Sequence, residues 1–165
     1  MKPMIVLGLD PGLRTTGWGS VFLKDKEVIY QPSGLIKTPE KCPTPERLAY
    51  LFQALTTIIR EYCPEEVSVE EVFVNKNPKS SLKLALARGV VLCAPAVIGL
   101  PVFSYAPNYM KKALSGYGHA DKNQIGWAVQ QILKLKTPPQ KDAADALGLA
   151  ICHSYAKSTP QCSFD

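Results

Sequence analysis

The sequence predicts one mixed α/β domain, and three observations lead to that prediction. The chain has 165 residues, which suits one domain, and 46% of them are hydrophobic, an ordinary share for a globular protein. An unbroken apolar run at residues 4–9 has strand length and fits a central strand that is covered on both faces. Strand-like and helix-like segments then follow in the order βββαβαβααα, which is typical of a mixed sheet with helices.

The first half of the chain predicts a β-meander, a helix and a further strand. A turn at residues 24–26 joins the second and third strands, so these are expected to pair antiparallel. Thr44 is predicted to cap the helix, with Pro45 in its first position, and apolar residues at helical spacing follow until Pro64 ends it. The expected strands are residues 4–9, 17–23, 27–36 and 67–70.

The second half predicts one strand, at residues 101–105, and four helices. Asn77-Pro78 begins the first of these helices, and Pro95 is expected to kink or end it, because a proline inside a helix lacks an amide donor and clashes with the preceding turn. Pro107 opens the next helix, Asp121 is expected to cap the third, and the last covers about residues 141–155. The helix after Pro78 carries its apolar residues along one face: Leu82, Ala85, Leu86, Gly89, Val90 and Cys93.

Charge is distributed unevenly along the chain. Of 19 basic and 14 acidic residues, 8 basic and 10 acidic ones lie at positions up to Glu71, whereas 11 basic and 4 acidic ones follow it. The net charge is therefore −2 in the first part and +7 in the second, which reproduces the overall +5. A basic half indicates a polyanionic partner, most simply nucleic acid, and a solvated lysine-rich surface is the alternative interpretation.

Composition also argues against several classes of protein. The five cysteines are scattered without a CxxC pair, which disfavours a disulfide framework and a zinc knuckle. The uncharged apolar stretch at residues 89–103 is too short for a membrane span and contains Pro95 and Pro101. The first apolar run ends at Asp10 without the small-residue cleavage site of an export signal, so a cytoplasmic protein is expected.

Four carboxylates form the most informative pattern. Asp10 and Glu70 each end a predicted buried strand, and they lie side by side if these strands are neighbours in the sheet. Asp142 and Asp145 are three residues apart, hence on one face of the last helix, among small apolar residues. Each has a plain alternative, since Asp142 alone fits a helix N-cap and Glu70 alone fits a solvated strand end. The rival Glu71 is expected to point to the opposite face from Glu70.

A divalent cation is the simplest reason to gather these acids. Negative charges on an apolar helix face are costly unless a cation or a donor compensates them. Ions of the magnesium type prefer carboxylate oxygens and are commonly shared with a substrate phosphate. Two such ions about 4 Å apart stabilise the attacking and leaving oxygens of an in-line phosphodiester displacement. The four acids together therefore predict a phosphodiester-hydrolysing metal site.

Ordered motifs across most of the chain resemble one known family. They are Gly8-Leu9-Asp10-Pro11-Gly12 with Thr16-Gly17, Val69-Glu70-Glu71-Val72-Phe73 with Lys76-Asn77, Ala87-Arg88-Gly89, and Asp142-Ala143-Ala144-Asp145-Ala146-Leu147. In this order and spacing, from about residue 5 to residue 153, the chain resembles the RuvC family of crossover junction endodeoxyribonucleases. The resemblance implies an RNase H-like fold, a five-stranded mixed β-sheet flanked by α-helices, in one nuclease domain at residues 1–157 with a short tail at 158–165.

The resemblance also implies roles for individual residues. The four metal-binding acids of the family fall on Asp10, Glu70, Asp142 and Asp145, which would hold two Mg²⁺ ions, with Mn²⁺ as a substitute. Catalytic lysines fall on Lys111 and Lys122, and Lys112 is the candidate if the register differs by one. Phe73 matches an aromatic placed against bases at the crossover, with a strand-end core aromatic as the alternative.

Other residues receive simpler interpretations. His119 and His153 are interpreted as a solvated loop histidine and a helix-end histidine rather than as acid or base groups. Pro95 interrupts the helix that family members use in dimerisation, which affects the expected interface. Four basic residues are expected to contact the flanking DNA backbone. Arg14 follows the first predicted strand, Lys76 precedes the second predicted helix, and Lys79 and Lys83 lie within that helix.

The function implied by the resemblance is resolution of four-way (Holliday) junctions by symmetric paired nicks that leave 5′-phosphate and 3′-hydroxyl ends, in recombination and DNA repair. It implies a homodimer, four-way junction DNA as substrate, and the branch-migration proteins RuvA and RuvB as partners. No association with a membrane is expected. Three alternatives are an RNase H-like nuclease acting on structured RNA, a phosphotransferase or ATPase of the actin and sugar-kinase type, and a structure-specific DNA-binding protein without catalysis. The second lacks the duplicated domain it needs, and the third predicts a missing acid.

Overall fold

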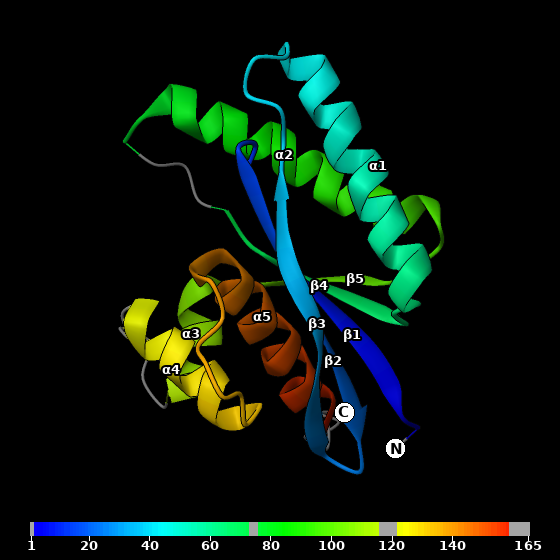
Figure 1. The fold of residues 1–165 in the computed structure, drawn as a ribbon, viewed down its shortest axis with the longest axis vertical. Helices are drawn as coiled ribbons and strands as arrows, with labels where there is room; N and C mark the ends of the chain where they lie inside the picture. The colour runs from blue at the N-terminus through cyan, green and yellow to red at the C-terminus, as the bar shows by residue number, and fades with distance from the viewer. Residues whose placement is uncertain (1, 73–75, 116–121, 159–165) are drawn as a thin grey trace, which may run out of the picture.

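A five-stranded mixed sheet with helices on both faces forms the computed structural model of the chain (Figure 1). The structure describes residues 2–72, 76–115 and 122–158, except for the side chains of residues 122 and 123. The strands stand in the order β3-β2-β1-β4-β5, with β1 antiparallel to β2 and parallel to β4. The strands are β1 (Met4–Asp10), β2 (Thr15–Lys24), β3 (Glu27–Lys37), β4 (Glu66–Glu70) and β5 (Val102–Tyr105).

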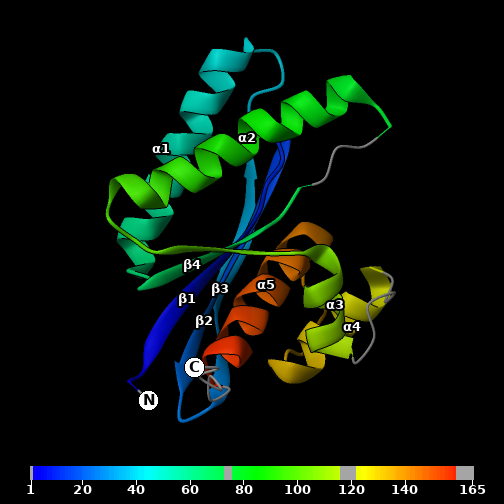
Figure 2. The same ribbon diagram turned by 180° about the vertical axis from the view of Figure 1, so that it is seen from behind.

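Two helical layers enclose the sheet. α1 (Thr44–Tyr62) and α2 (Pro78–Val97) cover one face, and α5 (Lys141–Ser158) covers the other together with α3 (Pro107–Ser115) and α4 (Lys122–Ile132), as both ribbon views show (Figures 1 and 2). Alternation along β1 separates the two cores, because Leu7 and Leu9 pack toward α1 and α2 while Val6 packs toward α5. The predicted α/β class and element order are therefore confirmed.

One local prediction was wrong, a second differs from the structure by two residues, and a third falls on a residue that the structure does not describe. Thr44 is the first helical residue of α1 rather than its cap, since Pro43 holds the cap position with an extended backbone and the N-cap has no side-chain hydrogen bond. α2 continues two residues past Pro95, because the carbonyl of Pro95 accepts hydrogen bonds from the amides of Ile98 and Leu100 and so closes the last turn. The predicted cap Asp121 lies outside the described residues.

Most of the apolar face predicted for α2 lies on the side that this chain leaves exposed, although Val90 packs against the core. The residues that α2 buries against α1 and the sheet are Ala87, Val91 and Ala94, whereas Leu82 is 66% exposed and Leu86 48%. α2 is the one described helix that is long and apolar enough to cross a membrane by length and composition alone. Its buried stripe shows that one side of this helix already belongs to the core of the domain.

Candidate metal centre

Asp10 and Glu70 end two neighbouring parallel strands. The register of β1 and β4 pairs Leu9 with Val69, so the next residues, Asp10 and Glu70, follow side by side along the two strands. Because Leu9 and Val69 both pack toward α1 and α2, alternation directs Asp10 and Glu70 toward the face that carries α5. The predicted adjacency of these two strands is confirmed.

Two glycines let α5 approach this end of the sheet closely. A Cβ atom at Gly17 of β2 would overlap the carbonyl oxygen of Asp142, and a Cβ atom at Gly8 of β1 would overlap that of Ala146. No other residue type fits without displacing the helix, so the glycines fix the distance between α5 and β1. The first turns of α5 therefore lie directly against the strand that ends at Asp10.

This packing brings three of the four predicted acids together. Asp10, Asp142 and Asp145 each offer a carboxylate oxygen, and these oxygens all lie within 4.8 Å of one another. All three residues are half-buried. Carboxylate oxygens are the ligands that Mg²⁺ prefers, so the donor set of these three acids fits this ion.

The fourth acid is not part of this three-residue group. Glu70 is half-buried at the end of β4, and its backbone carbonyl accepts a hydrogen bond of 3.2 Å from Nε of Arg88 on α2.

Asp142 lies inside the first turn of α5, which begins at Lys141, so it is a helical residue rather than an N-cap. Its position at a helix N-terminus, where the macrodipole is positive, lowers the cost of gathering carboxylates there.

The candidate lysines lie on the helices beside α5. Lys111 is half-buried on α3, and its neighbours Met110 and Leu114 contact the helix at Gly148, one turn beyond Asp145. Lys112 is exposed on the same helix. Lys122 is the first residue of α4, but its side chain, like Phe73 and His119, lies outside the described part of the chain.

Basic side chains line a groove beyond the end of β1. Its volume is about 550 Å³, and its lining includes Arg14 and Lys83, two of the predicted DNA contacts. Lys76 and Lys79 are exposed just before and within the first turn of α2. The residues that line this groove are Gly12, Leu13, Arg14, Thr15, Glu40, Arg47, Ser80, Lys83 and Leu84.

Arg47 is a groove residue that the sequence did not reveal. Its Nε donates to the hydroxyl of Thr38 at 2.9 Å, and a terminal nitrogen donates to the carbonyl of Leu13 at 3.2 Å. These bonds tie α1 to the turn that follows β1. Arg14 pairs with Glu40 at 2.6 Å across the same groove, and both side chains are largely exposed. The sequence around Arg47 contains no motif that would mark it as a groove residue.

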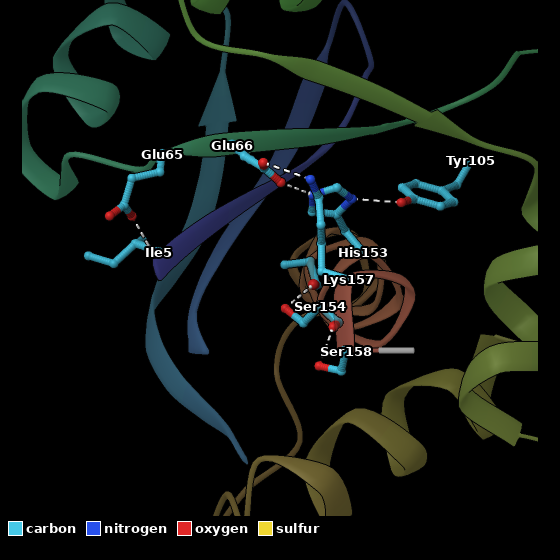
Figure 3. A network of polar contacts seen from close by, with 9 residues as sticks. Ile5, Glu65, Glu66, Tyr105, His153, Ser154, Lys157 and Ser158 are labelled. Carbon is cyan, nitrogen blue, oxygen red and sulfur yellow. Dashed lines mark hydrogen bonds and ion pairs between the residues drawn. The ribbon is translucent and has the colours of Figure 1, made fainter. Parts of the chain in front are cut away.

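His153 differs from its interpretation as a helix-end histidine. It is buried, its Nδ1 lies 2.6 Å from the hydroxyl of Tyr105, and its Nε2 lies 2.5 Å from a carboxylate oxygen of Glu66 (Figure 3). Lys157 pairs with the other oxygen of Glu66 at 2.9 Å. The network joins α5 to β4 and β5 at the far end of β4 from Glu70, so it fastens the helix rather than supplying the acidic cluster.

Burial decides the charge of this network. Desolvation lowers the pKa of His153, so the ring is neutral near pH 7 and its contact with Glu66 is a hydrogen bond. Burial acts to raise the pKa of Glu66, but hydrogen bonds from Lys157 and His153 outweigh it and hold that pKa below its usual value. Burial also raises the pKa of Tyr105 to about 12, so its hydroxyl stays protonated and donates to Nδ1.

The mixed sheet with acids at the end of its central strand and on the crossing helix defines an RNase H-like fold. A family model described as crossover junction endodeoxyribonuclease RuvC matches residues 6–153. RuvC of Xanthobacter autotrophicus is 47% identical over 150 residues, covering 91% of this chain and 89% of that protein. RuvC of Rhodopseudomonas palustris is 44% identical over 154 residues, covering 93% and 88%. The chain belongs to the RuvC family of crossover junction endodeoxyribonucleases.

Solved structures agree with this assignment. Thermus thermophilus RuvC in complex with a Holliday junction substrate superposes with a TM-score of 0.86 at 34% identity, covering 94% of this chain and 96% of that one. The yeast mitochondrial Holliday junction resolvase has a TM-score of 0.69 at 12% identity, covering 93% and 80%, and shows the shared fold alone. The resemblance and the RNase H-like fold predicted from the motifs are therefore confirmed.

Proposed function

We propose that this chain resolves four-way DNA junctions by paired, symmetric phosphodiester hydrolysis that leaves 5′-phosphate and 3′-hydroxyl ends. The observation that carries the proposal is the convergence of Asp10, Asp142 and Asp145, whose oxygens lie within 4.8 Å of one another. Family membership gives that cluster a phosphodiester substrate, and a relative with 34% identity has been solved with a Holliday junction bound.

Mg²⁺ is the proposed cofactor, two ions to a site, with Mn²⁺ as a substitute. When bound, such ions supply Lewis-acid stabilisation of the phosphate and a nucleophilic water at neutral pH. Asp10 is suited to hold both, because it ends a rigid central strand between β2 and β4. If two ions bind, Glu70 and Asp145 would each complete the ligands of one of them, and Asp142 would hold the second ion or its water.

Lysines provide the positive charge around the reacting phosphate. Lys111 lies on α3, which packs against α5 one turn from Asp145, and Lys122 begins α4. We assign both to stabilisation of the charge that develops on the phosphate, with Lys112 as a neighbouring DNA contact. Phe73 follows Glu70 by three residues and is assigned to the bases at the crossover.

The groove beyond β1 suits the DNA backbone. Arg14, Arg47 and Lys83 line it, and it begins directly after the strand that ends at Asp10. Lys76 and Lys79 extend the basic surface to the start of α2. Contacts of this kind position the duplex without reading its sequence.

We also propose a homodimer through α2, and the exposed side of that helix supports it. Apolar and small residues recur there at helical spacing, and Figure 2 shows α2 along the outside of the domain. A two-fold interface matches the two-fold symmetry of a junction and supplies two active sites for two nicks. The residues of this stripe are Leu82, Leu86, Gly89, Cys93 and Val97.

Incubation of the purified chain with a labelled mobile four-way junction, with and without Mg²⁺, tests the activity. Paired nicks at symmetric positions that need the metal and can be sealed by a ligase are expected. Competition with structured RNA tests the alternative substrate, and an RNA that outcompetes the junction would replace DNA as the substrate. Absence of cleavage in Mg²⁺ and in Mn²⁺ would reject the proposal.

Light scattering tests the dimer. Wild-type protein is expected to be dimeric at micromolar concentration, and Leu86→Asp is expected to be monomeric because a carboxylate would face its own copy in an apolar interface. Glu46→Asp, an exposed change on α1, is the matched control and should leave the dimer intact. A wild-type monomer that still makes paired cuts would contradict the assignment.

Two further assignments rest on family membership alone. RuvA and RuvB, the branch-migration proteins, are the proposed partners on the junction, and the cytoplasm is the proposed location. Co-sedimentation of this chain with a junction already loaded with RuvA is the direct test, and the chain should join the complex without displacing the DNA.

A further inference from the structure

A groove of about 420 Å³ lies between α4 and the start of α5, outside the acidic cluster and the basic groove described above. One wall is Trp127, the side chain of which is 65% exposed. The groove has Gln130 and Lys141 as polar lining and the consecutive prolines Pro138 and Pro139 in the loop between the helices. The lining residues are Gly126, Trp127, Gln130, Pro138, Pro139, Lys141 and Ala144.

The groove adjoins the acidic cluster through α5. Lys141 and Ala144 each precede an acid, Asp142 and Asp145, by one residue, and they are three residues apart. On a helix this spacing gives two adjacent stripes, one toward the sheet and one toward α4. A strand whose phosphate lies at the acids therefore passes close to the groove.

The chemistry of the lining favours a nucleobase. An exposed indole beside cationic side chains is the combination that binds single-stranded nucleic acid, because the aromatic ring stacks on a base and the cations meet the backbone. Lys141 stands in the groove, and Lys136 lines a second hollow of about 320 Å³ that shares Pro138 and Pro139 with it. An apolar protein segment would need a larger uncharged patch than one tryptophan between lysines offers.

We propose that this groove binds an unstacked base of the cleaved strand, with Trp127 as the stacking platform and Lys141 on the adjoining phosphate. Bases at the crossover of a four-way junction lack the continuous stack of a duplex, so one of them is available at low cost. The proposal rests on the proposed function, since it places that base next to the phosphate at the acids. It adds a determinant of junction over duplex binding that does not involve the metal.

Tryptophan fluorescence tests the stacking directly. The chain has two tryptophans, so quenching that wild type shows and Trp127→Phe lacks belongs to Trp127. We expect quenching on titration with a four-way junction without divalent metal, and also with a single-stranded oligothymidine, but not with a continuous duplex. Equal quenching by the duplex, or none with junction and oligothymidine, would overturn the proposal.

Binding and cleavage of the junction complete the test. Loss of a stacked base is expected to weaken junction binding by about 5- to 150-fold in Trp127→Ala, whereas Trp127→Phe retains a ring and should lose much less. Tyr50→Ala is the matched control, because Tyr50 is 47% exposed on α1, outside the groove. Circular dichroism establishes that each variant folds.

The outcomes separate this proposal from the function. Wild type that neither binds nor cleaves junctions would remove the proposed function, and oligothymidine quenching would still report on the groove. Wild type that cleaves while Trp127→Ala binds and cleaves equally well would refute base binding. A protein partner would then be the remaining occupant for the groove.

Discussion

Gly17→Ala tests whether the close approach of α5 to β2 positions the acids. The added Cβ would lie 2.5 Å from the carbonyl carbon of Asp142, whereas ordinary contacts of a Cβ begin at 3.4 Å. The carbonyl oxygen of Asp142 would lie closer still, so the first turn of α5 must move by more than about 0.9 Å, the difference between these distances, or β2 must bend by as much. Either movement shifts Asp142 and Asp145 relative to Asp10.

Two consequences of this shift have estimable sizes. Overpacking of a tight contact costs about 1 to 3 kcal/mol, which lowers the melting temperature of a domain of this size by about 2 to 12 °C. A misplacement of about 1 Å at a reacting centre costs about 100-fold in rate. Junction affinity should change little, because the lysines and arginines that meet the backbone lie elsewhere.

Single-turnover cleavage of a labelled junction, with protein in excess, separates the chemical step from binding. Gly17→Ala should cleave about 100-fold more slowly while anisotropy shows near-normal binding. Gly126→Ala is the control for thermal unfolding. A Cβ there meets no atom within 4 Å and alanine is the better helix former, so the melting temperature of this variant should not fall. Wild-type cleavage and an unchanged melting temperature in Gly17→Ala would refute the reasoning.

Three further predictions concern the acids, the basic surface and the histidine network. Asp10→Asn should slow cleavage at least about 1,000-fold, with junction binding equal or slightly tighter. The control Asp25→Asn, in the turn between β2 and β3, should change neither cleavage nor binding. Loss of binding and folding together with activity in Asp10→Asn would make Asp10 a structural residue. Junction affinity should fall linearly with salt on a log-log plot, and Lys79→Ala should lessen the slope; an affinity independent of salt would exclude phosphate contacts. The pKa values of His153 and Glu66 are both lowered in the folded protein, so these groups contribute their full share to the free energy of unfolding above about pH 6.5 and lose it as acid protonates them, His153 first. Melting temperatures measured from pH 7 to pH 4 should therefore fall less steeply in His153→Gln than in wild type. Parallel curves for the two proteins would contradict this.

The strands and helices were largely predictable because each carries its own signal. β1 is an apolar run that ends in Asp-Pro-Gly, and β2 and β3 flank a turn at Asp25 and Lys26, both of which have positive φ. α3 begins at Pro107 and α5 at Lys141, as the local pattern indicates. These signals act within a few residues, so one sequence suffices to detect them.

Long-range packing was less accessible. The pattern of α2 marks Leu82 and Leu86 as an apolar face, but an apolar stripe has the same appearance whether it meets a core or a second subunit. The partners of His153 come from β4 and β5, which are 87 and 48 residues away in the chain. Nothing local distinguishes such a histidine from one at a solvated helix end.

The acidic cluster was predictable in part, because its residues carry local signals but its geometry depends on long-range packing. The spacing of Asp142 and Asp145 predicts a shared helix face, and the ends of β1 and β4 predict two neighbouring carboxylates, but which oxygens meet depends on how α5 crosses the sheet. That crossing depends on the absence of a side chain at Gly8 and Gly17, a signal that is visible in the sequence only once the partner helix is known.

One face of β4 shows how partners, rather than residue type, divide structural from functional acids. Alternation directs Glu66, Ser68 and Glu70 toward α5, so the strand presents two carboxylates about four residues apart to the same helix. Lys157 balances the charge of Glu66, and His153 lies within hydrogen-bond distance of its other carboxylate oxygen, so both residues fasten the C-terminal half of α5 to β4. Glu70 lies at the other end of the strand, the end at which Asp10, Asp142 and Asp145 gather their carboxylates. Carboxylate oxygens are the ligands that divalent cations of the magnesium type prefer, so the acidic end of the sheet has the donor set of a metal site, whereas the contacts at Glu66 are structural and fasten α5 to β4.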